Sequence, residues 1–392
     1  MKLLFWLCLA GVLWCYAGYP LVMVLRARLR PRPLERSGIT EPPAISVVLA
    51  VRDGASYLGR RVENLLAQEY PADRLEVLVV CNGCTDGTEE IATGLSQSDP
   101  RVKVLVSAAE QGKAGALNAG VARASGEFVV FADVRQSFSP GTLRALLEPF
   151  GDAEVGAVSG RLVIQRGEAA AVEGVRLYWG METALRLAES RTGSVVGATG
   201  AIYAIRRECF ESIPARTILD DVWLPMRIAM AGRRVVLEPT AVAEDRSAED
   251  ARREYLRKRR TMVGNLQLVR MMPALLSPAR NPILARYVSH KLLRLATPFL
   301  FLGMLVAAGL VAEPLYRAFF VLELGGYLLG GLGLVRPLPL LSLPSAFVMM
   351  HAAIFSALRQ FRADAGGVWV PVPTPRTERV SGAALARTAE RD

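Results

Sequence analysis

Four polar residues in the middle of this chain recur at comparable places: Asp53, Asn82, Lys113 and Asp133. Each lies at or just after the end of a short apolar run that is typical of a buried strand. Asp53 and Asn82 also suit turns, and Lys113 suits a solvated surface, so no single one identifies a site. Together they indicate one, because carboxylates can bind a divalent cation or accept a proton, and a lysine can offset phosphate charge.

Histidine chemistry is excluded from this middle region. The chain has two histidines, His290 and His351, and both lie in a hydrophobic C-terminal region. Catalysis by Ser-His-Asp or Cys-His groups, and a histidine-rich metal site, therefore do not fit. Of the five cysteines, Cys81 and Cys84 form a C-x-x-C pair, but no second pair or nearby histidine completes a zinc site. The irregular cysteine spacing suits a reducing compartment.

The apolar runs occupy residues 45–51, 75–80, 102–106 and 127–132, and they alternate with segments at helical spacing. This alternation predicts an α/β fold with a mostly parallel, doubly wound sheet. The carboxyl ends of parallel strands meet at one edge of such a sheet, where ligands bind. We therefore expect the four polar residues to gather at that edge.

A long uncharged segment at the N-terminus, residues 3–25, predicts a membrane span. At about 1.5 Å per residue it is long enough to cross a bilayer. Four arginines follow it directly: Arg26, Arg28, Arg30 and Arg32. The positive-inside rule places them in the cytosol. We expect a multi-pass protein of the cell inner (plasma) membrane whose middle region is cytosolic.

Three further apolar segments, 295–312, 318–335 and 337–358, are candidate spans, although the second carries Glu323. Three crossings would place the C-terminus outside, whereas the arginines of the tail favour the inside. The alternatives stay open: three C-terminal spans, or two spans with one segment that is interfacial or re-entrant. The net charge is +10, and arginines cluster beside the hydrophobic ends. This favours a membrane surface, and there is no nucleic-acid-binding motif.

Six blocks of sequence, in order along residues 45–270, resemble one known family. They read VLVVCNGCTDGTEEIA, GKAGALNAG, GEFVVFADVRQ, GATGAIYAIRR, ILDDVWLP and RKRRTMVGN. Together they resemble the family 2 glycosyltransferases, which have the GT-A fold. The flanking hydrophobic segments resemble the membrane-embedded branch of that family, which includes cellulose, hyaluronan and poly-N-acetylglucosamine synthases.

The resemblance implies a nucleotide-sugar donor, expected to be a UDP-sugar, that lies over the first strands. Asp53 and Asn82 would contact its uridine part, and Lys113 the nucleotide or its phosphates. Asp133 matches the first aspartate of the family's D-x-D metal motif, and Arg135 replaces the second. Asp133 would then bind Mg²⁺ or Mn²⁺ together with the donor diphosphate, or Arg135 would supply positive charge to the phosphates directly.

On the acceptor side, Asp220 and Asp221 match the last two residues of the family's T-E-D motif. The resemblance makes Asp221 the general base that accepts the proton of the acceptor hydroxyl in an inverting transfer. Two adjacent carboxylates are also common at the start of a helix, where the helix dipole favours them. Gly200 and Ala201 resemble the loop that binds the acceptor sugar.

A basic segment follows, in which Arg257 and Arg260 align with the glutamine and arginine of the family's Q-x-x-R-W motif. We expect both to bind the diphosphate. A basic helix lying on anionic lipid would explain the same residues, and both roles can hold. Thr261 replaces the tryptophan that lines the polymer path in processive synthases, which favours a single transfer.

We therefore predict a membrane-bound inverting glycosyltransferase that moves a sugar from a nucleotide-sugar to a saccharide or lipid-linked acceptor in cell-surface or exopolysaccharide synthesis. The alternatives are a polyprenyl-phosphate glycosyltransferase and a non-catalytic membrane scaffold. A sugar nucleotidyltransferase would need a Gly-rich, Arg-containing loop that this chain lacks. The expected regions are a transmembrane helix with its basic flank (1–32), the GT-A domain (33–290), a transmembrane bundle (291–361) and a polar tail (362–392).

Overall fold

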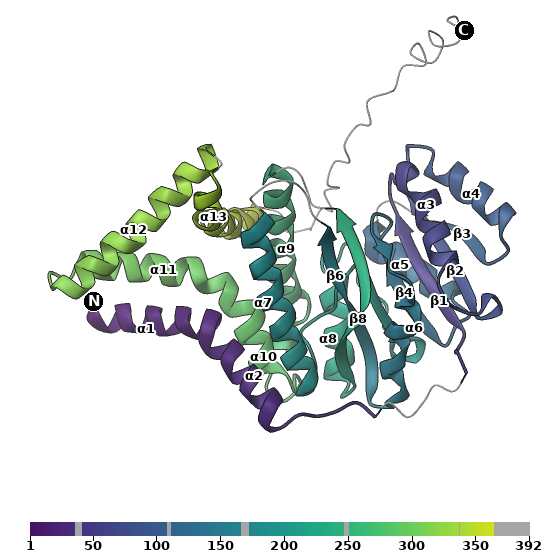
Figure 1. The fold of residues 1–392 in the computed structure, drawn as a ribbon, viewed down its shortest axis with the longest axis horizontal. Helices are drawn as coiled ribbons and strands as arrows, with labels where there is room; N and C mark the ends of the chain where they lie inside the picture. Colours follow the sequence, from purple (N-terminus) through teal and green to yellow (C-terminus); the bar gives the residue numbers. More distant parts are fainter. Residues whose placement is uncertain (36–40, 108–110, 166–171, 247–250, 337, 364–392) are drawn as a thin grey trace, which may run out of the picture.

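A computed structural model describes residues 1–35, 41–107, 111–165, 172–246, 251–336 and 338–363. An α/β domain and a group of long helices lie next to each other along the longest axis of the molecule (Figure 1). The predicted tail at 362–392 lies outside the described residues from position 364 onward. The described helices are α1 (Lys2–Leu13), α2 (Tyr19–Leu29), α3 (Ala55–Leu66), α4 (Thr88–Ser98), α5 (Gly112–Arg123), α6 (Thr142–Leu147), α7 (Val172–Arg191), α8 (Asp220–Met230), α9 (Ala251–Met271), α10 (Leu284–Tyr287), α11 (Leu293–Gly309), α12 (Pro314–Val335) and α13 (Ser342–Ala363).

The described strands form a single eight-stranded sheet in the order β3-β2-β1-β4-β7-β6-β8-β5. Their bounds are β1 (Ile45–Val51), β2 (Leu75–Asn82), β3 (Val102–Ser107), β4 (Phe128–Ala132), β5 (Ser137–Phe138), β6 (Val155–Gln165), β7 (Ile202–Arg206) and β8 (Arg234–Arg246). The strands β3, β2, β1 and β4 are mutually parallel, as the alternating sequence pattern predicts. The prediction of a mostly parallel α/β sheet is confirmed for this half.

The other half of the sheet is mixed. Strand β7 runs antiparallel to both β4 and β6, β6 and β8 are parallel, and the short β5 is antiparallel to β8. The sheet as a whole is therefore mixed and mostly parallel, with helices on both faces, as in the GT-A fold. Strands β5 to β8 all lie beyond residue 132 and were not predicted from the sequence, although they too alternate with helices along the chain.

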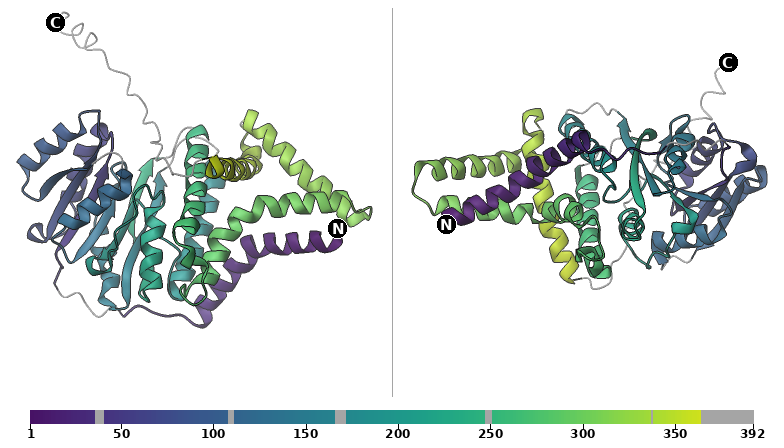
Figure 2. Two further views of the ribbon diagram at one scale, coloured as in Figure 1. Left: turned by 180° about the vertical axis from the view of Figure 1, so that it is seen from behind. Right: turned by 90° about the horizontal axis from the view of Figure 1, so that it is seen from below.

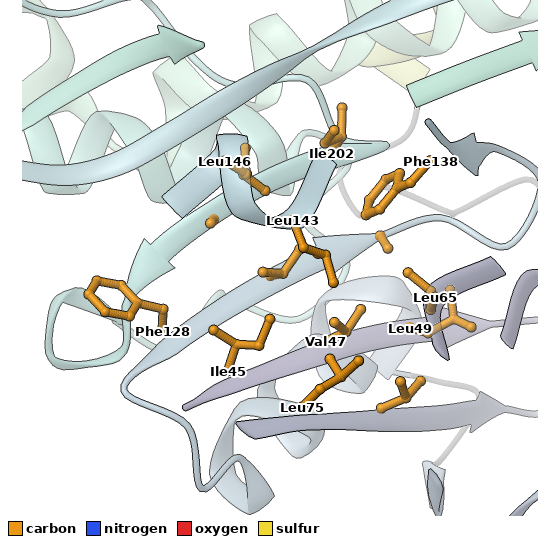
Figure 3. Close-up of a cluster of buried hydrophobic side chains, with 14 of the residues drawn as sticks. Ile45, Val47, Leu49, Leu65, Leu75, Phe128, Phe138, Leu143, Leu146 and Ile202 are labelled. Atoms are coloured by element: carbon orange, nitrogen blue, oxygen red, sulfur yellow. The ribbon is translucent and has the colours of Figure 1, made fainter. Parts of the chain in front are cut away.

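The core lies on both faces of β1, which is buried along nearly its whole length. Ile45, Val47 and Leu49 point toward Leu65 of α3 and Leu143 of α6 (Figure 3). Val48 and Ala50 of the strand pack on the opposite face, in the cluster that also contains residues of α5. Full burial of each aliphatic side chain contributes about 1.5–3 kcal/mol. The strand is therefore a rigid support for the loop that follows it.

Three of the described helical segments are long and apolar enough to cross a membrane: Lys2–Leu29, Leu284–Gly309 and Pro314–Val335. Short π-helical turns join α1 to α2 and α10 to α11 within the first two of these segments. Helix α13, which covers most of the expected span at 337–358, is not among the three. It lies across the direction of α1, α11 and α12 (Figure 2).

Helices α7 and α9 stand between the sheet and the apolar helices (Figure 1). Buried polar contacts join the N-terminal segment to α7 and to the turn before α11. The hydroxyl of Tyr19 donates to Glu189 at 2.5 Å, and His290 lies 2.9 Å from Glu189 and 2.8 Å from Glu182. Met23 packs beside them against α7. The first apolar segment is therefore joined to the α/β domain by specific side chains.

Candidate functional site

The expected site lies at the carboxyl ends of the parallel strands. Strand β1 ends just before Asp53, β2 ends at Asn82, and β4 ends just before Asp133. Asp53 has a φ of 51° and accepts hydrogen bonds from Thr85 N at 2.8 Å and Thr85 Oγ1 at 3.1 Å. Asn82 is 2% exposed. The sequence expectation that these residues share one edge therefore agrees with the fold.

A second carboxylate, which the sequence analysis did not single out, ties the loops after β1 and β2 together. Asp86 accepts a hydrogen bond from Ala55 N at 3.0 Å, and Gly54 N donates to Thr88 Oγ1 at 2.9 Å. Burial opposes ionisation of Asp86, but its hydrogen bonds from Thr88 and Ala55 outweigh that effect and lower its pKa. These hydrogen bonds hold the loops after β1 and β2 together next to Asp53.

Lys113 connects three elements at the centre of the site. It is the second residue of α5, and its Nζ lies 2.9 Å from Asp133 Oδ1 and 3.6 Å from Asp220 Oδ2. Burial alone would lower the pKa of Lys113, but the charges of Asp133 and Asp220 outweigh burial and raise it. Lys113 is therefore a permanent cation held between the carboxylates of Asp133 and Asp220.

Asp220 and Asp221 are the first two residues of α8, where the helix dipole favours negative charge. Asp220 is 3% exposed and Asp221 is half-buried. Burial, followed by the neighbouring charge of Asp220, raises the pKa of Asp221 to about 6, although Lys113 opposes this shift. A carboxylate whose pKa lies near neutral pH is suited to accept a proton from a reacting group.

The loop that holds Gly200 lies directly against Asp221. Ala198 N donates to the main-chain oxygen of Asp221 at 2.7 Å. A Cβ atom at Gly200 would lie 2.8 Å from Asp221 Oδ2, closer than real contacts allow. Gly197 has a φ of 90°, which favours glycine. Two glycines thus let this loop approach the carboxylate, and Ala201 follows as a buried residue.

Arg186 of α7 holds the loop that contains Gly197 and Gly200 in place. Its guanidinium donates to Thr199 Oγ1 at 2.9 Å, Ser159 Oγ at 2.9 Å and the main-chain oxygen of Gly197 at 3.3 Å. The sequence analysis missed this residue, because an arginine within a long helix looks like a surface residue.

Tyr203 of β7 is a second residue that the sequence did not indicate. It is fully buried and stacks on Phe131 of β4 with a ring separation of 4.5 Å. Burial, together with the charges of Asp220 and Asp221, raises the pKa of its hydroxyl. That hydroxyl has no hydrogen-bond partner among the described residues. A neutral phenol therefore lies close to the two aspartates.

Arg135, which replaces the second aspartate of the D-x-D motif, forms an ion pair with Asp245. Its Nη2 lies 2.7 Å from Asp245 Oδ2 at the end of β8, and Gln136 Nε2 donates to the same oxygen at 2.8 Å. Asp245 is mostly buried, whereas the Arg135 side chain is 44% exposed. The sequence analysis did not identify Asp245, because it lies more than a hundred residues downstream.

Helix α9 carries Arg257 and Arg260 alongside the segment that leads to Asp220. A turn beyond Arg260, Gly264 packs against Leu219, where a Cβ would lie 2.6 Å from the leucine Cγ. Ile218 N donates to Gln267 Oε1 at 2.9 Å. Arg257 and Arg260 are half-buried. Their helix is thus fixed against Ile218 and Leu219, the two residues directly before Asp220.

The residues at this edge fit a divalent cation only as a partner of a bound diphosphate. No group of three or more His, Cys, Asp or Glu side chains within the described parts of the chain is placed to hold a metal. Asp133 contributes one carboxylate, and its Oδ1 already pairs with Lys113. Phosphate oxygens would have to supply much of the remaining coordination, since Mg²⁺ commonly uses one or two carboxylates plus substrate phosphates.

Residues 46–213 match the family model described as glycosyl transferase family 2. This chain carries a glycosyl transferase family 2 domain. The match begins in β1 and ends just before α8, so it includes Asp53, Asn82, Lys113 and Asp133.

Known relatives include a β-monoglucosyldiacylglycerol synthase from Synechocystis sp., which is 27% identical over 57% of this chain and 49% of its own length. An uncharacterized glycosyltransferase from Nostoc sp. is 34% identical over 31% of this chain and 38% of its own. The chain therefore spans less than half of the length of these two relatives.

Among solved structures, a mannosyltransferase from Pyrobaculum calidifontis, determined in complex with GDP-Man and Mn²⁺, superposes with a TM-score of 0.69. The similarity covers 93% of this chain and 100% of that one, at 23% sequence identity. The shared fold therefore extends beyond the transferase domain to most of the helical region.

Proposed function

We propose that this protein is a membrane-bound inverting glycosyltransferase that moves a sugar from a nucleotide-sugar to an acceptor hydroxyl. The single observation that carries the proposal is the arrangement of Asp133, Lys113, Asp220 and Asp221, in which a half-buried cation links a carboxylate just after β4 to one at the start of α8. A family 2 domain supplies the reaction class, and the site supplies groups for both halves of the reaction.

In this reaction, Asp221 accepts the proton of the acceptor hydroxyl as its oxygen attacks C1 of the donor sugar. The bond from C1 to the diphosphate breaks, and the nucleoside diphosphate leaves with the electron pair. Lys113 lies where it can offset the charge of the leaving group, and Arg257 and Arg260 are proposed to bind the same phosphates. Asp53 and Asn82 would hold the nucleoside, and Gly200 and Ala201 the acceptor.

A divalent cation, Mg²⁺ or Mn²⁺, would offset part of the diphosphate charge, and Asp133 is the residue that would hold it. The Pyrobaculum mannosyltransferase was solved with Mn²⁺, which supports this choice. Arg135 would contribute a second positive charge from its position on Asp245. We expect donor binding to depend on the metal less steeply than in proteins with an intact D-x-D motif.

We infer that the donor is a UDP-sugar and that the acceptor is a saccharide or lipid-linked, with products destined for the cell surface. The Synechocystis relative, named as a synthase of a glucosylated diacylglycerol, supports a lipid acceptor. The GDP-Man of the Pyrobaculum structure makes GDP-sugars the first competitors to test. A single transfer, including one to a polyprenyl phosphate, fits Thr261 better than processive synthesis.

Three spans, with the arginines after the first one in the cytosol, would place the transferase domain and the C-terminus on the cytosolic side of the plasma membrane. This orientation gives the domain access to nucleotide-sugars. It also removes the conflict between the number of spans and the arginine-rich tail.

The test is a donor screen with the purified full-length chain, by thermal shift with UDP- and GDP-sugars, each with and without Mn²⁺. Transfer or slow hydrolysis of the stabilising donor is then measured for the wild type and for Asp221→Asn. We expect stabilisation by one nucleotide class, and activity that is lost in Asp221→Asn while donor binding remains. The scaffold alternative requires neither stabilisation nor turnover, and that result would overturn the proposal.

A further inference from the structure

An apolar groove runs between α9, α11 and α13, where the helical region meets the transferase domain. It has a volume of about 530 Å³. A second hollow of about 480 Å³ shares Phe299 and Leu358 with it and continues along α13. The two together form one elongated surface feature, which we call the lateral groove.

The walls of the lateral groove are almost entirely hydrocarbon. They are formed by Leu266 and Val269 of α9, Leu295 and Ala296 of α11, and Ile354 of α13, among others, and Arg270 of α9 is the charged residue in this lining. Phe299 is 47% exposed and Phe355 is 43% exposed. Because α11 belongs to a candidate membrane span, this surface is at a place where a lipid chain, rather than water, can cover it.

Arginines stand at one end of this apolar surface. Arg359 and Arg362 line the second hollow and lie three residues apart on α13, so their side chains are neighbours on one helix face. Both are exposed, and neither side chain makes an ion pair with another described residue. Two guanidinium groups at the end of a hydrocarbon-lined groove are complementary to a phosphate attached to an acyl or prenyl chain.

We propose that the lateral groove binds a membrane lipid with a phosphate headgroup. The hydrocarbon chain lies along α11 between α9 and α13, and Arg359 and Arg362 contact the phosphate. A polypeptide partner or a second copy of the chain would have to supply both an apolar ridge and an adjacent anion, whereas one lipid molecule supplies both. This site is separate from the nucleotide edge, and the inference does not rest on the proposed function.

The lateral groove is close to structures that position the catalytic residues. Ala357 of α13 packs with Val263 of α9 and with Ile218, two residues before Asp220. Met262 lines the groove and packs against this same cluster. A bound lipid would therefore fill the space behind α9 and hold α13 against the segment that leads to Asp220.

The experiment is native mass spectrometry of the full-length protein in mild detergent, with phosphatidylglycerol or phosphatidylcholine of identical acyl chains. The variant R359Q/R362Q removes the headgroup contacts. R317Q is the matched control, because Arg317 is an exposed arginine at the start of α12 that does not line the groove. We expect wild type and R317Q to retain phosphatidylglycerol about tenfold better than phosphatidylcholine, and R359Q/R362Q to lose that preference.

A second variant tests the hydrocarbon part. Ala296→Phe places a ring in the groove without changing charge, and we expect it to reduce retention of both lipids. Melting temperatures of all variants identify any loss of fold. The proposal is overturned if wild type holds the two lipids equally, if R359Q/R362Q and R317Q retain phosphatidylglycerol alike, or if a folded Ala296→Phe protein binds both lipids like wild type.

Discussion

The ammonium group of Lys113 lies 2.9 Å from the carboxylate of Asp133, and this ion pair crosses from the start of α5 to the end of β4. It fixes a positive charge at the position where the family resemblance expects the donor diphosphate. The contact with Asp220, at 3.6 Å, links the same ammonium group to the start of α8. If the proposed donor binds here, its phosphates would meet a cation that the fold already holds in place.

Replacing Lys113 by methionine should weaken binding of the nucleoside diphosphate. The loss of one charged contact is worth about 1.5–3 kcal/mol, which corresponds to about 10- to 100-fold in Kd. Isothermal titration with UDP and GDP measures the change. Lys103→Met is the matched control, because Lys103 pairs with Glu76 on β3 and β2 rather than with the site. Equal affinities in Lys113→Met and Lys103→Met would contradict the role of Lys113.

The raised pKa of Asp221, about 6, predicts the acidic limb of the pH profile. A general base must be ionised, so activity should fall tenfold per pH unit below about pH 6 and level off above it. Initial rates between pH 5 and 8, at saturating donor and acceptor, measure this limb. A rate that is independent of pH down to 5 would rule out Asp221 as the base with this pKa.

Asp221 should also lower the free energy of unfolding at neutral pH. The pKa of Asp221 is higher in the folded chain than its ordinary value of 3.8, so ionisation favours the unfolded state. The cost is present above pH 6 and disappears as the pH falls below 4. Asp221→Asn should therefore raise the free energy of unfolding at pH 7.5 by about 3 kcal/mol while abolishing transfer. Thermal melts at pH 7.5 and pH 4 test this, and a gain that persists at pH 4 would point to another cause.

Gly200→Ala should inactivate the protein without unfolding it. The new methyl group would meet Asp221 Oδ2 at 2.8 Å, so the carboxylate must move away from the acceptor loop. A displacement of this kind typically costs about 100-fold in rate. Gly94→Ala, on α4 where a Cβ meets nothing within 4 Å, is the control and should remain active. Comparable activity in the two variants would show that the contact between Gly200 and Asp221 is not needed for transfer.

Restoring the second aspartate of the D-x-D motif should not by itself increase stability or activity. In Arg135→Asp, the new carboxylate would face Asp245, which loses its ion pair at 2.7 Å. We expect a lower melting temperature and lower activity from this single change. Adding Asp245→Asn should recover stability and, with two motif aspartates present, increase the affinity for Mn²⁺. Manganese titrations followed by thermal shift compare the four proteins of this cycle, and additive effects of the two changes would refute the coupling.

The sequence was sufficient for the parallel half of the sheet, because β1 to β4 alternate with helices and each strand carries a polar residue at its end. Asp133 and Lys113 could be placed at one edge on that basis. Asp245 and Tyr203 could not, because strand pairing across more than seventy residues brings them to the site. Arg186 was hidden for a similar reason, since its hydrogen-bond partners belong to a loop and a different strand.

Hydropathy selected one more candidate membrane span than there are described helices long and apolar enough to cross. Hydropathy identified the segments that make up the three candidate spans, but it also selected the region of α13. Its position across the other helices comes from packing: Gly330 and Gly333 of α12 admit the start of α13, and Ala357 near its other end is buried against Ile218. Composition alone does not distinguish such a helix from a span.

The buried hydrogen bond from Tyr19 to Glu189 has a practical consequence for anyone who wishes to work with the transferase domain alone. A fragment that begins after the first apolar segment would expose the surface of α7 that this segment covers and leave Glu189 and His290 without their aromatic partner. Fusing an unrelated transmembrane helix would restore attachment to the bilayer but not this interior contact. The N-terminal segment thus contributes specific buried contacts to α7, and another apolar helix would not replace them.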